Sequence, residues 1–162
     1  MASQAQPVEI RPSVFADLPD VLRVRQAQEL ADSGSSITTV DGLTAEWAAL
    51  GSRLPLQVRV AVTADGELIA CADVVRVDQV LMLRYWALSE HRDIRLASTL
   101  LAAAEQGAHE MGREEGARTQ RFFAQAAGSH PEVQQALLQL DFLAVSTYEA
   151  SVPYDSMWTQ RA

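Results

Sequence analysis

A nearly uninterrupted apolar run from Val80 to Leu88, followed closely by a long helical stripe, limits the folds open to this sequence. A run of this length and composition is typical of a central strand that is covered on both faces. The stripe begins after Arg92 and places apolar residues at helical spacing: Leu96, Leu100, Leu101, Ala104, Ala108 and Met111. Gly112 or Gly116 can end that helix. Together the two segments predict a βα unit whose helix packs against the sheet.

The residues before this unit predict a β-hairpin. Valine recurs at every second position over residues 58–62, and a second β-rich segment covers residues 68–77. Between them lies Asp65-Gly66, a common hairpin turn. A short connection at Asp78-Gln79 then joins the hairpin to the central strand. These segments therefore predict neighbouring antiparallel strands.

Helices and strands at both ends complete the domain. We expect a strand at 8–11, which Pro12 stops, and a helix that Asp17 begins and Ser33-Gly34 ends. Further patterns predict a helix at 44–51, a strand at 117–124, a helix at 131–140 and a strand at 142–152. The order is β-α-α-β-β-β-α-β-α-β, an α/β (α+β) domain with a mixed, mostly antiparallel sheet flanked by helices. We expect one domain over residues 8–153, with tails at 1–7 and 154–162.

The composition argues against several classes of protein. The chain has 162 residues, the usual size of one domain, and a net charge of −8. Proteins that bind nucleic acid normally carry a basic face, and no apolar run reaches the ~18–20 residues that span a bilayer. With no signal sequence evident, we expect a cytoplasmic protein without nucleic-acid or membrane partners. Cys71 is the only cysteine, so we expect no intrachain disulfide and no cysteine-based metal site. His91 and His109 have no plausible partner ligand, so we expect no other metal site either.

Three segments carry a resemblance to a known family. Residues 87–101 form the sequence ALSEHRDIRLASTLL. This is similar to the signature V-x-P-x-x-R-G-x-G-x-G/A followed by x-x-L-L in the GNAT (GCN5-related N-acetyltransferase) family. The start of the chain, with Ile10-Arg11-Pro12 and residues 16–22, resembles the family's first strand and helix, and Leu140-Asp141-Phe142 matches its late L-G-F. The likeness covers roughly residues 8–152 and implies a GNAT-like fold.

The resemblance also implies a site for acetyl-CoA as co-substrate. In the family, the strand aligns the thioester through its backbone, and the following loop and helix start hold the pyrophosphate, as helix N-termini suit anions. The matching residues in this chain are Tyr85, Trp86, Ala87, Arg92, Asp93, Ile94, Arg95, Leu96, Ala97 and Ser98. Two of them depart from the family, because Asp93 and Arg95 stand where glycines are expected. Arg95 can either fill the phosphate cradle or swing out and pair with a phosphate. Asp93 would repel the pyrophosphate unless it is turned away or paired with an arginine.

The catalytic positions of the family are altered as well. Acyl transfer to an amine needs a base for the ammonium proton and an acid for the leaving thiolate. The family's acid tyrosine corresponds here to Leu137, which cannot donate a proton. The remaining candidates are His130, which also marks a helix start before Pro131, and Tyr148, near the expected acceptor pocket. Asp73 is a further candidate, because it lies in a hydrophobic strand where burial disfavours its charged form.

The resemblance implies an enzyme that transfers acetyl from acetyl-CoA to an amine by direct attack. The acceptor is expected to be a small-molecule or peptide amine, bound near residues 33–47 and the last strands. In place of the missing tyrosine, water would carry proton transfer. The alternative is a catalytically inactive GNAT-like domain that serves as a binding, regulatory or dimerisation module, with a homodimer as one form. The altered residues Asp93, Arg95 and Leu137 motivate this alternative.

Overall fold

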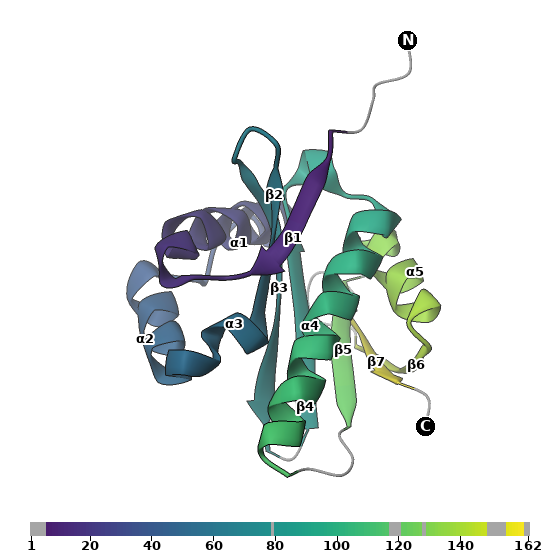
Figure 1. Cartoon of the computed structure of the whole chain (residues 1–162). Coiled ribbons are helices and arrows are strands. Elements are labelled where there is room, and N and C mark those ends of the chain that lie inside the picture. Colours follow the sequence, from purple (N-terminus) through teal and green to yellow (C-terminus); the bar gives the residue numbers. More distant parts are fainter. Residues whose placement is uncertain (1–5, 79, 117–120, 128, 149–154, 161–162) are drawn as a thin grey trace.

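The computed structural model describes residues 6–78, 80–116, 121–127, 129–148 and 155–160. A seven-stranded sheet in the order β1-β2-β3-β4-β5-β7-β6 lies at its centre (Figure 1). The strands are β1 (Val8–Pro12), β2 (Val58–Thr63), β3 (Leu68–Val77), β4 (Val80–Ala87), β5 (Phe122–Ala127), β6 (Phe142–Tyr148) and β7 (Asp155–Gln160). Only β4 and β5 pair in parallel, and the other neighbouring strands are antiparallel. The predicted mixed, mostly antiparallel sheet is confirmed.

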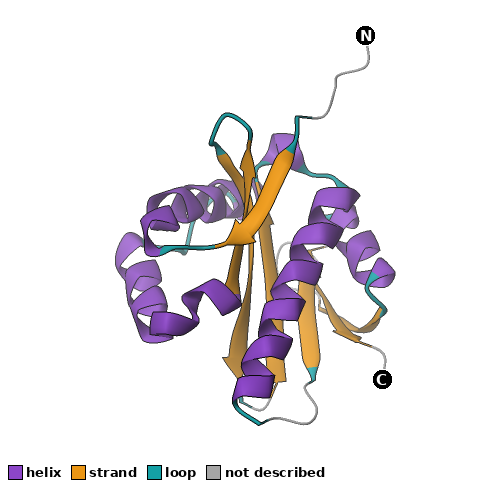
Figure 2. Cartoon of the chain, viewed as in Figure 1, coloured by secondary structure: helices purple, strands orange, loops and turns teal. Residues whose placement is uncertain are grey.

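Helices cover both faces of this sheet (Figure 2). They are α1 (Leu18–Ser33), α2 (Val40–Leu50), α3 (Leu54–Gln57), α4 (Ile94–Glu114) and α5 (Pro131–Gln139). The first two lie on one face, and α4 and α5 pack together on the other. The apolar stripe predicted on α4 is buried along its whole length. No helix in the described part of the chain combines the length and hydrophobicity needed to cross a membrane.

The ends of the helices follow from local chemistry. The first α-helix stops at Gly34, whose φ of 77° suits a left-handed cap and whose N–H donates to the Leu30 carbonyl. The second begins at Val40, earlier than the predicted Thr44, because the Thr39 hydroxyl caps it by accepting from the Gly42 N–H at 3.1 Å. A threonine cap five residues before the predicted start explains the difference.

The end of the chain corrects the sequence prediction. Residues 154–162 were expected to be a tail, but residues 155–160 form β7, which inserts between β5 and β6. Its anchor is Trp158, which is 6% exposed and opposite Ala124 on β5 and Ala144 on β6. The sheet therefore continues beyond the predicted boundary at residue 153. Met157 and Trp158 are the only apolar residues of this segment, so it lacks a hydrophobic alternation strong enough to mark a strand.

Two other strands begin or end differently from the prediction. The strand expected at 117–124 is β5 at 122–127, with 117–120 outside the described residues. The strand expected at 142–152 is β6 at 142–148, and residues 149–152 lie outside the described part as well. Between α5 and β6, Asp141 has a φ of 63°. This left-handed conformation is one that aspartate tolerates better than most residues.

Candidate functional site

The sheet opens between β4 and β5. These strands pair only from Leu81 opposite Phe122 to Leu83 opposite Ala124. Beyond that point β4 stays paired with β3 as far as Ala87, while β5 stays paired with β7 as far as Ala127. The two strands therefore diverge toward their carboxyl ends, and the edges that face each other there carry backbone groups without a strand partner.

The phase of the β3–β4 ladder decides which backbone groups face this gap. Leu88 donates its N–H to the Ile69 carbonyl on the β3 side at 3.0 Å, and Leu81 donates toward β5, to the Arg121 carbonyl, at 2.9 Å. Because backbone groups alternate along an antiparallel strand, Tyr85 and Ala87 face the gap. The Trp86 backbone faces β3 instead. Of the three strand residues expected to align a cofactor, the structure thus brings Tyr85 and Ala87 to the gap.

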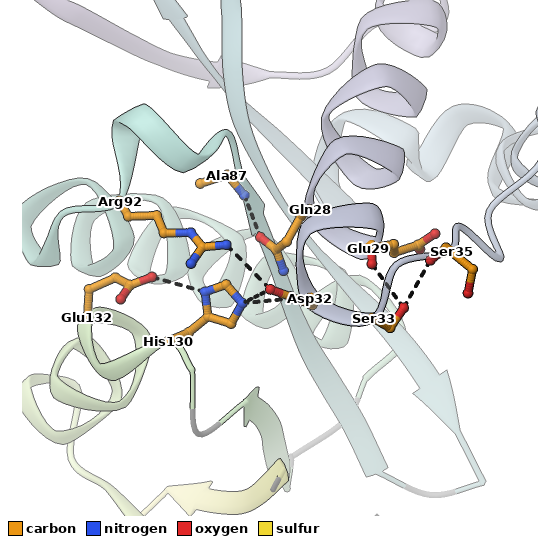
Figure 3. A network of polar contacts seen from close by, with 9 residues as sticks. All are labelled: Gln28, Glu29, Asp32, Ser33, Ser35, Ala87, Arg92, His130 and Glu132. Carbon is orange, nitrogen blue, oxygen red and sulfur yellow. Dashed lines mark hydrogen bonds and ion pairs between the residues drawn. The ribbon is translucent and has the colours of Figure 1, made fainter. Parts of the chain in front are cut away.

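One of these groups already has a partner within the chain. The Ala87 N–H donates to the side-chain carbonyl of Gln28 at 2.9 Å (Figure 3). Gln28 lies on α1 and is half-buried. A side-chain amide from the opposite layer therefore closes part of the gap.

The start of α4 is occupied in a similar way. Asp93 is the N-cap residue, and its Oδ1 accepts from the Leu96 N–H at 2.8 Å. Its carbonyl also accepts from the Ala97 N–H at 3.2 Å. An aspartate at this position satisfies free helix amides and places a negative charge at the positive end of the helix. The sequence left open whether Asp93 turns away or pairs with an arginine, and in the structure it caps the helix.

The other residues of the predicted cradle are divided among several roles. Arg95 is exposed, forms no ion pair with any described residue, and lines a surface hollow of about 830 Å³ beside β1 together with Thr99. Leu96 and Ala97 are buried in the core, and Ile94 is half-buried. Ser98 donates its hydroxyl to Oε1 of Gln139 on α5 at 2.7 Å. Asp93 and Leu96 line the same hollow, so Arg95 lies beside the start of α4, and its pairing with a phosphate stays a prediction.

A network of charged residues joins the carboxyl ends of the two diverging strands (Figure 3). His130, which follows β5 and is 3% exposed, has its Nε2 2.8 Å from both carboxylate oxygens of Asp32. Its Nδ1 lies 3.2 Å from Oε1 of Glu132. Arg92, which follows β4, places its Nη2 3.4 Å from Oδ1 of Asp32. Asp32, at the end of α1, therefore bridges the loops that follow β4 and β5.

This geometry determines what His130 can do. Both ring nitrogens of His130 lie within hydrogen-bond distance of carboxylate oxygens, which only accept hydrogen bonds. Neither nitrogen is therefore left open to a substrate. Of the predicted catalytic candidates, His130 is thus at the gap but fully engaged, and it is neither solvated nor a side-chain cap.

Tyr85 contributes a side chain as well as backbone to this region. It is 9% exposed, and its hydroxyl is buried with no hydrogen-bond partner among the described residues. Burial, reinforced by the negative charges of Asp93 and Glu132, raises the pKa of that hydroxyl. It therefore stays a protonated donor. Buried donors without an acceptor are uncommon in folded proteins, and this one lies near the starts of both α4 and α5.

Asp73 lies away from the gap in a buried ion cluster on the α1 face. Its carboxylate accepts from Arg25 at 2.5 Å and from two nitrogens of Arg84 at 2.7 Å each. Arg84 also reaches Oε1 of Glu46 at 2.7 Å, and the ring of Trp86 lies 4.0 Å from the Arg25 guanidinium. Burial tends to lower the pKa of Arg84, but the two carboxylates outweigh it and raise that pKa. A carboxylate held by two guanidinium groups is poorly placed to act as a base.

Three further positions complete the set that the sequence singled out. Leu137 is buried in the core, as its apolar side chain requires. Tyr148 ends β6, but its side chain lies outside the described residues, so its catalytic role stays a prediction. Burial raises the pKa of Cys71 to about 12, so its thiol stays protonated and behaves as a small hydrophobic group. Within the described parts of the chain, no group of three or more histidine, cysteine or acidic residues could hold a metal ion.

Sequence reasoning missed the residues that α1 and α5 send to the gap. Gln28 and Asp32 are one helical turn apart, so they share a face of α1. Glu132 follows His130 closely in the sequence, yet nothing marks it as a partner for a buried histidine. The i, i+4 spacing of Gln28 and Asp32 is common on exposed helix faces, so only the packing of α1 against the sheet identifies these side chains as part of the site.

Known structures share this architecture. A GCN5-related N-acetyltransferase from Sphaerobacter thermophilus matches 88% of this chain with 21% identity and a TM-score of 0.70, and this chain spans 46% of that protein. An acetyltransferase from Salmonella typhimurium, solved with its cofactor acetyl-CoA, matches 96% of this chain and 94% of its own, with 15% identity and a TM-score of 0.73. A GNAT superfamily phosphinothricin acetyltransferase from Sinorhizobium meliloti, in complex with acetyl-CoA, matches 94% and 87%, with 14% identity and a TM-score of 0.71.

These likenesses show the fold. No protein-family model matches the sequence, and no curated protein matches it. The identities of 14–21% are too low to carry an activity from one chain to another. The chain thus has the GNAT fold, and the fold that the sequence resemblance implied is confirmed.

Proposed function

We propose that this protein is an N-acetyltransferase that moves the acetyl group of acetyl-CoA to an amine. The observation that carries the proposal is the divergence of β4 and β5, which leaves backbone groups of Tyr85 and Ala87 facing a gap. Two of the structures that share the fold, from Salmonella typhimurium and Sinorhizobium meliloti, hold acetyl-CoA. An extended ligand with amide groups can complete the unpaired edge of a strand as another strand would.

The residues at the gap fit acetyl-CoA in part. Tyr85 offers its backbone and a buried hydroxyl without an acceptor, and the Nε of Arg92 is also buried without a partner among the described residues. The start of α4 offers the positive end of a long helix for the pyrophosphate. When bound, acetyl-CoA supplies a thioester carbon that an amine can attack and a thiolate that can leave.

The chain's own residues would position the reactants more than transfer protons. His130 has both ring nitrogens engaged, Asp73 is held by two arginines, and Leu137 cannot donate. We therefore assign the proton steps to water at the gap. The acceptor amine, a small molecule or a peptide, would approach near residues 33–47. There the Glu29 carboxylate fixes the loop by accepting from the Ile37 N–H at 2.9 Å and the Thr38 N–H at 3.0 Å.

A second function has its own supporting observation. Gln28 and Asp93 occupy backbone N–H groups that the cofactor would use. This favours a non-catalytic GNAT-like module that binds a partner, a second copy of itself or another ligand. Both functions use the same fold, and cofactor binding distinguishes them.

Thermal unfolding with acetyl-CoA, with free coenzyme A and with ATP as a control anion tests the proposal. A ligand at about 100 times its dissociation constant adds roughly 2.7 kcal/mol, which corresponds to a rise in Tm of about 5–11 °C for a domain of this size. We expect both coenzymes to raise the Tm more than ATP, which carries phosphates but no pantetheine arm. Thiol release from acetyl-CoA in the presence of a panel of amines then measures transfer. An unchanged Tm at millimolar acetyl-CoA would contradict the proposed acetyltransferase activity and would favour the non-catalytic binding module.

A further inference from the structure

The side chains of Gln28 and Asp93 occupy the positions at which an amide and a phosphate of acetyl-CoA would bind. Gln28 presents an amide carbonyl to the Ala87 N–H, the position along β4 where a ligand amide would pair. Asp93 presents an anionic oxygen to the Leu96 N–H, at the helix end where a phosphate would bind. Acetyl-CoA contains both groups, with amides in its pantetheine arm and a pyrophosphate beyond it.

The Gln28 contact is supported from within the fold, whereas Asp93 is an exposed helix cap. Gln28 is half-buried and comes from the helix layer on the opposite face to α4 (Figure 1). The Asp32–His130 contact at 2.8 Å, one turn further along α1, fixes that end of the helix against the loop after β5. The side chain of Gln28 is therefore held where it can reach the Ala87 N–H.

Groups near Asp93 could bind a phosphate if its carboxylate moved away. Its negative charge contributes to the raised pKa of the Tyr85 hydroxyl, which places the two groups within electrostatic reach. That hydroxyl has no acceptor among the described residues. A phosphate that replaced the Asp93 carboxylate would bring several acceptor oxygens to the same region. The helix amides would exchange one anion for another.

We infer that Gln28 and Asp93 are internal competitors of acetyl-CoA, which hold the gap in a ligand-like state until the coenzyme displaces them. The inference rests on the proposed function. Displacement returns the Gln28 amide to water and leaves the Asp93 carboxylate beside the incoming phosphates, so both lower the affinity for the coenzyme. Removing either side chain should therefore tighten binding, which is the opposite of what a ligand-contacting residue would show.

Isothermal titration with free coenzyme A and with ADP separates the two competitors. ADP carries a pyrophosphate but lacks the pantetheine arm. We expect Gln28→Ala to tighten coenzyme A binding roughly 2- to 10-fold, the value of one hydrogen bond, and to leave ADP unchanged. Asp93→Gly should tighten both ligands by roughly 10-fold, because it removes a charged competitor. The double variant should combine the two effects on coenzyme A.

Matched controls separate competition from a general loosening of the fold. Gln26→Ala removes the same residue type from the same helix, where Gln26 donates to the Thr38 carbonyl at 2.9 Å away from the gap. Thr39→Gly removes the cap of α2. Both should leave the dissociation constants unchanged. Asp93→Asn keeps a capping side chain without its charge, so it tests the electrostatic part if the glycine variant unfolds.

Each outcome decides the inference. Tighter binding by the variants supports it, and so does binding by the double variant when the native protein shows none. Unchanged or weaker binding by both variants, with binding by the native protein, overturns the inference and leaves the proposed function standing. If neither the native protein nor the double variant binds coenzyme A at millimolar concentration, the inference and the proposed function both fall.

Discussion

Replacing Asp73 with asparagine should destabilise the protein strongly, because it removes the closer of two carboxylates that neutralise Arg25. That arginine is 2% exposed, so its guanidinium cannot turn toward water. It lies 2.5 Å from Asp73 and 3.6 Å from Glu46. Arg84 is partly exposed and keeps its contact with Glu46. The substitution therefore leaves two cations with one carboxylate.

The size of the effect follows from this burial. Removing one partner of a buried ion pair costs about 3–5 kcal/mol, since the other charge stays in a medium that solvates it poorly. For a chain of this length, each kcal/mol lowers the Tm by about 2–4 °C, so the total decrease is roughly 6–20 °C. Screening by salt should change it little, because buried pairs are shielded from counter-ions.

Thermal and urea unfolding followed by circular dichroism measure the change, with Asp20→Asn as a matched control. Asp20 and Arg23 are exposed and 3.8 Å apart, so that variant should stay within about 0.5 kcal/mol of the native protein. The double variant Arg25→Met/Asp73→Leu should be more stable than Asp73→Leu alone, because it removes the stranded charge. An Asp73→Asn protein within 1 kcal/mol of native would refute the reasoning.

Three further predictions concern other parts of the fold. Arg11 donates two hydrogen bonds of 2.8 Å to Asp17 and lowers the pKa of that carboxyl below its ordinary value of 3.8. Asp17→Asn should therefore cost about 1–2 kcal/mol at pH 7, and this difference should disappear in urea titrations as the pH falls below about 3.8 through the depressed pKa. Glu29→Ala should speed amide hydrogen exchange roughly tenfold at Thr38 and its neighbour, because it removes their acceptor. Gly107→Ala should lower stability by about 3 kcal/mol, because a Cβ there would collide with a backbone carbonyl of α3.

Each of these predictions has a result that would contradict it. A pH-independent effect of Asp17→Asn would show that the loss is not electrostatic. Unchanged exchange rates in Glu29→Ala would mean that the loop between α1 and α2 holds its shape without the carboxylate. Gly42→Ala is the control for Gly107, since a Cβ there meets only the tip of a threonine side chain. Equal stabilities of these two alanine variants would contradict the close packing of α3 on α4.

The fold could be predicted because its strongest signals are periodic. The apolar run of β4 and the stripe of α4 fix one βα unit, and the Asp65-Gly66 turn fixes the hairpin before it. The segment at 155–160 escaped because its pairing depends on one buried tryptophan and on neighbours distant in sequence. A strand held by long-range partners leaves little trace in a short window of residues.

The site could be predicted only as a location. Residues 85–87 and 92–98 were expected to hold acetyl-CoA, which stays a prediction, and the structure places the start of α4 and the free edge of β4 beside one gap. What fills the gap could not be inferred, because Gln28 and Asp32 belong to a helix more than fifty residues upstream of β4's end. Their role depends on how α1 is oriented against the sheet, and the residue pattern within α1 does not predict that orientation.

Two of the three positions where this chain lacks an expected glycine, Asp141 and Arg95, differ in physical kind. Asp141 keeps the backbone geometry that favours glycine, with a φ of 63°, so an aspartate there adds strain without altering the path of the chain. Arg95 lies in regular helix, and its φ is not among the positive values of the described residues. The backbone therefore has no need of glycine at residue 95. A glycine there would serve only the close approach of a ligand, so Arg95 changes what can reach the start of α4 while Asp141 affects only the stability of the turn.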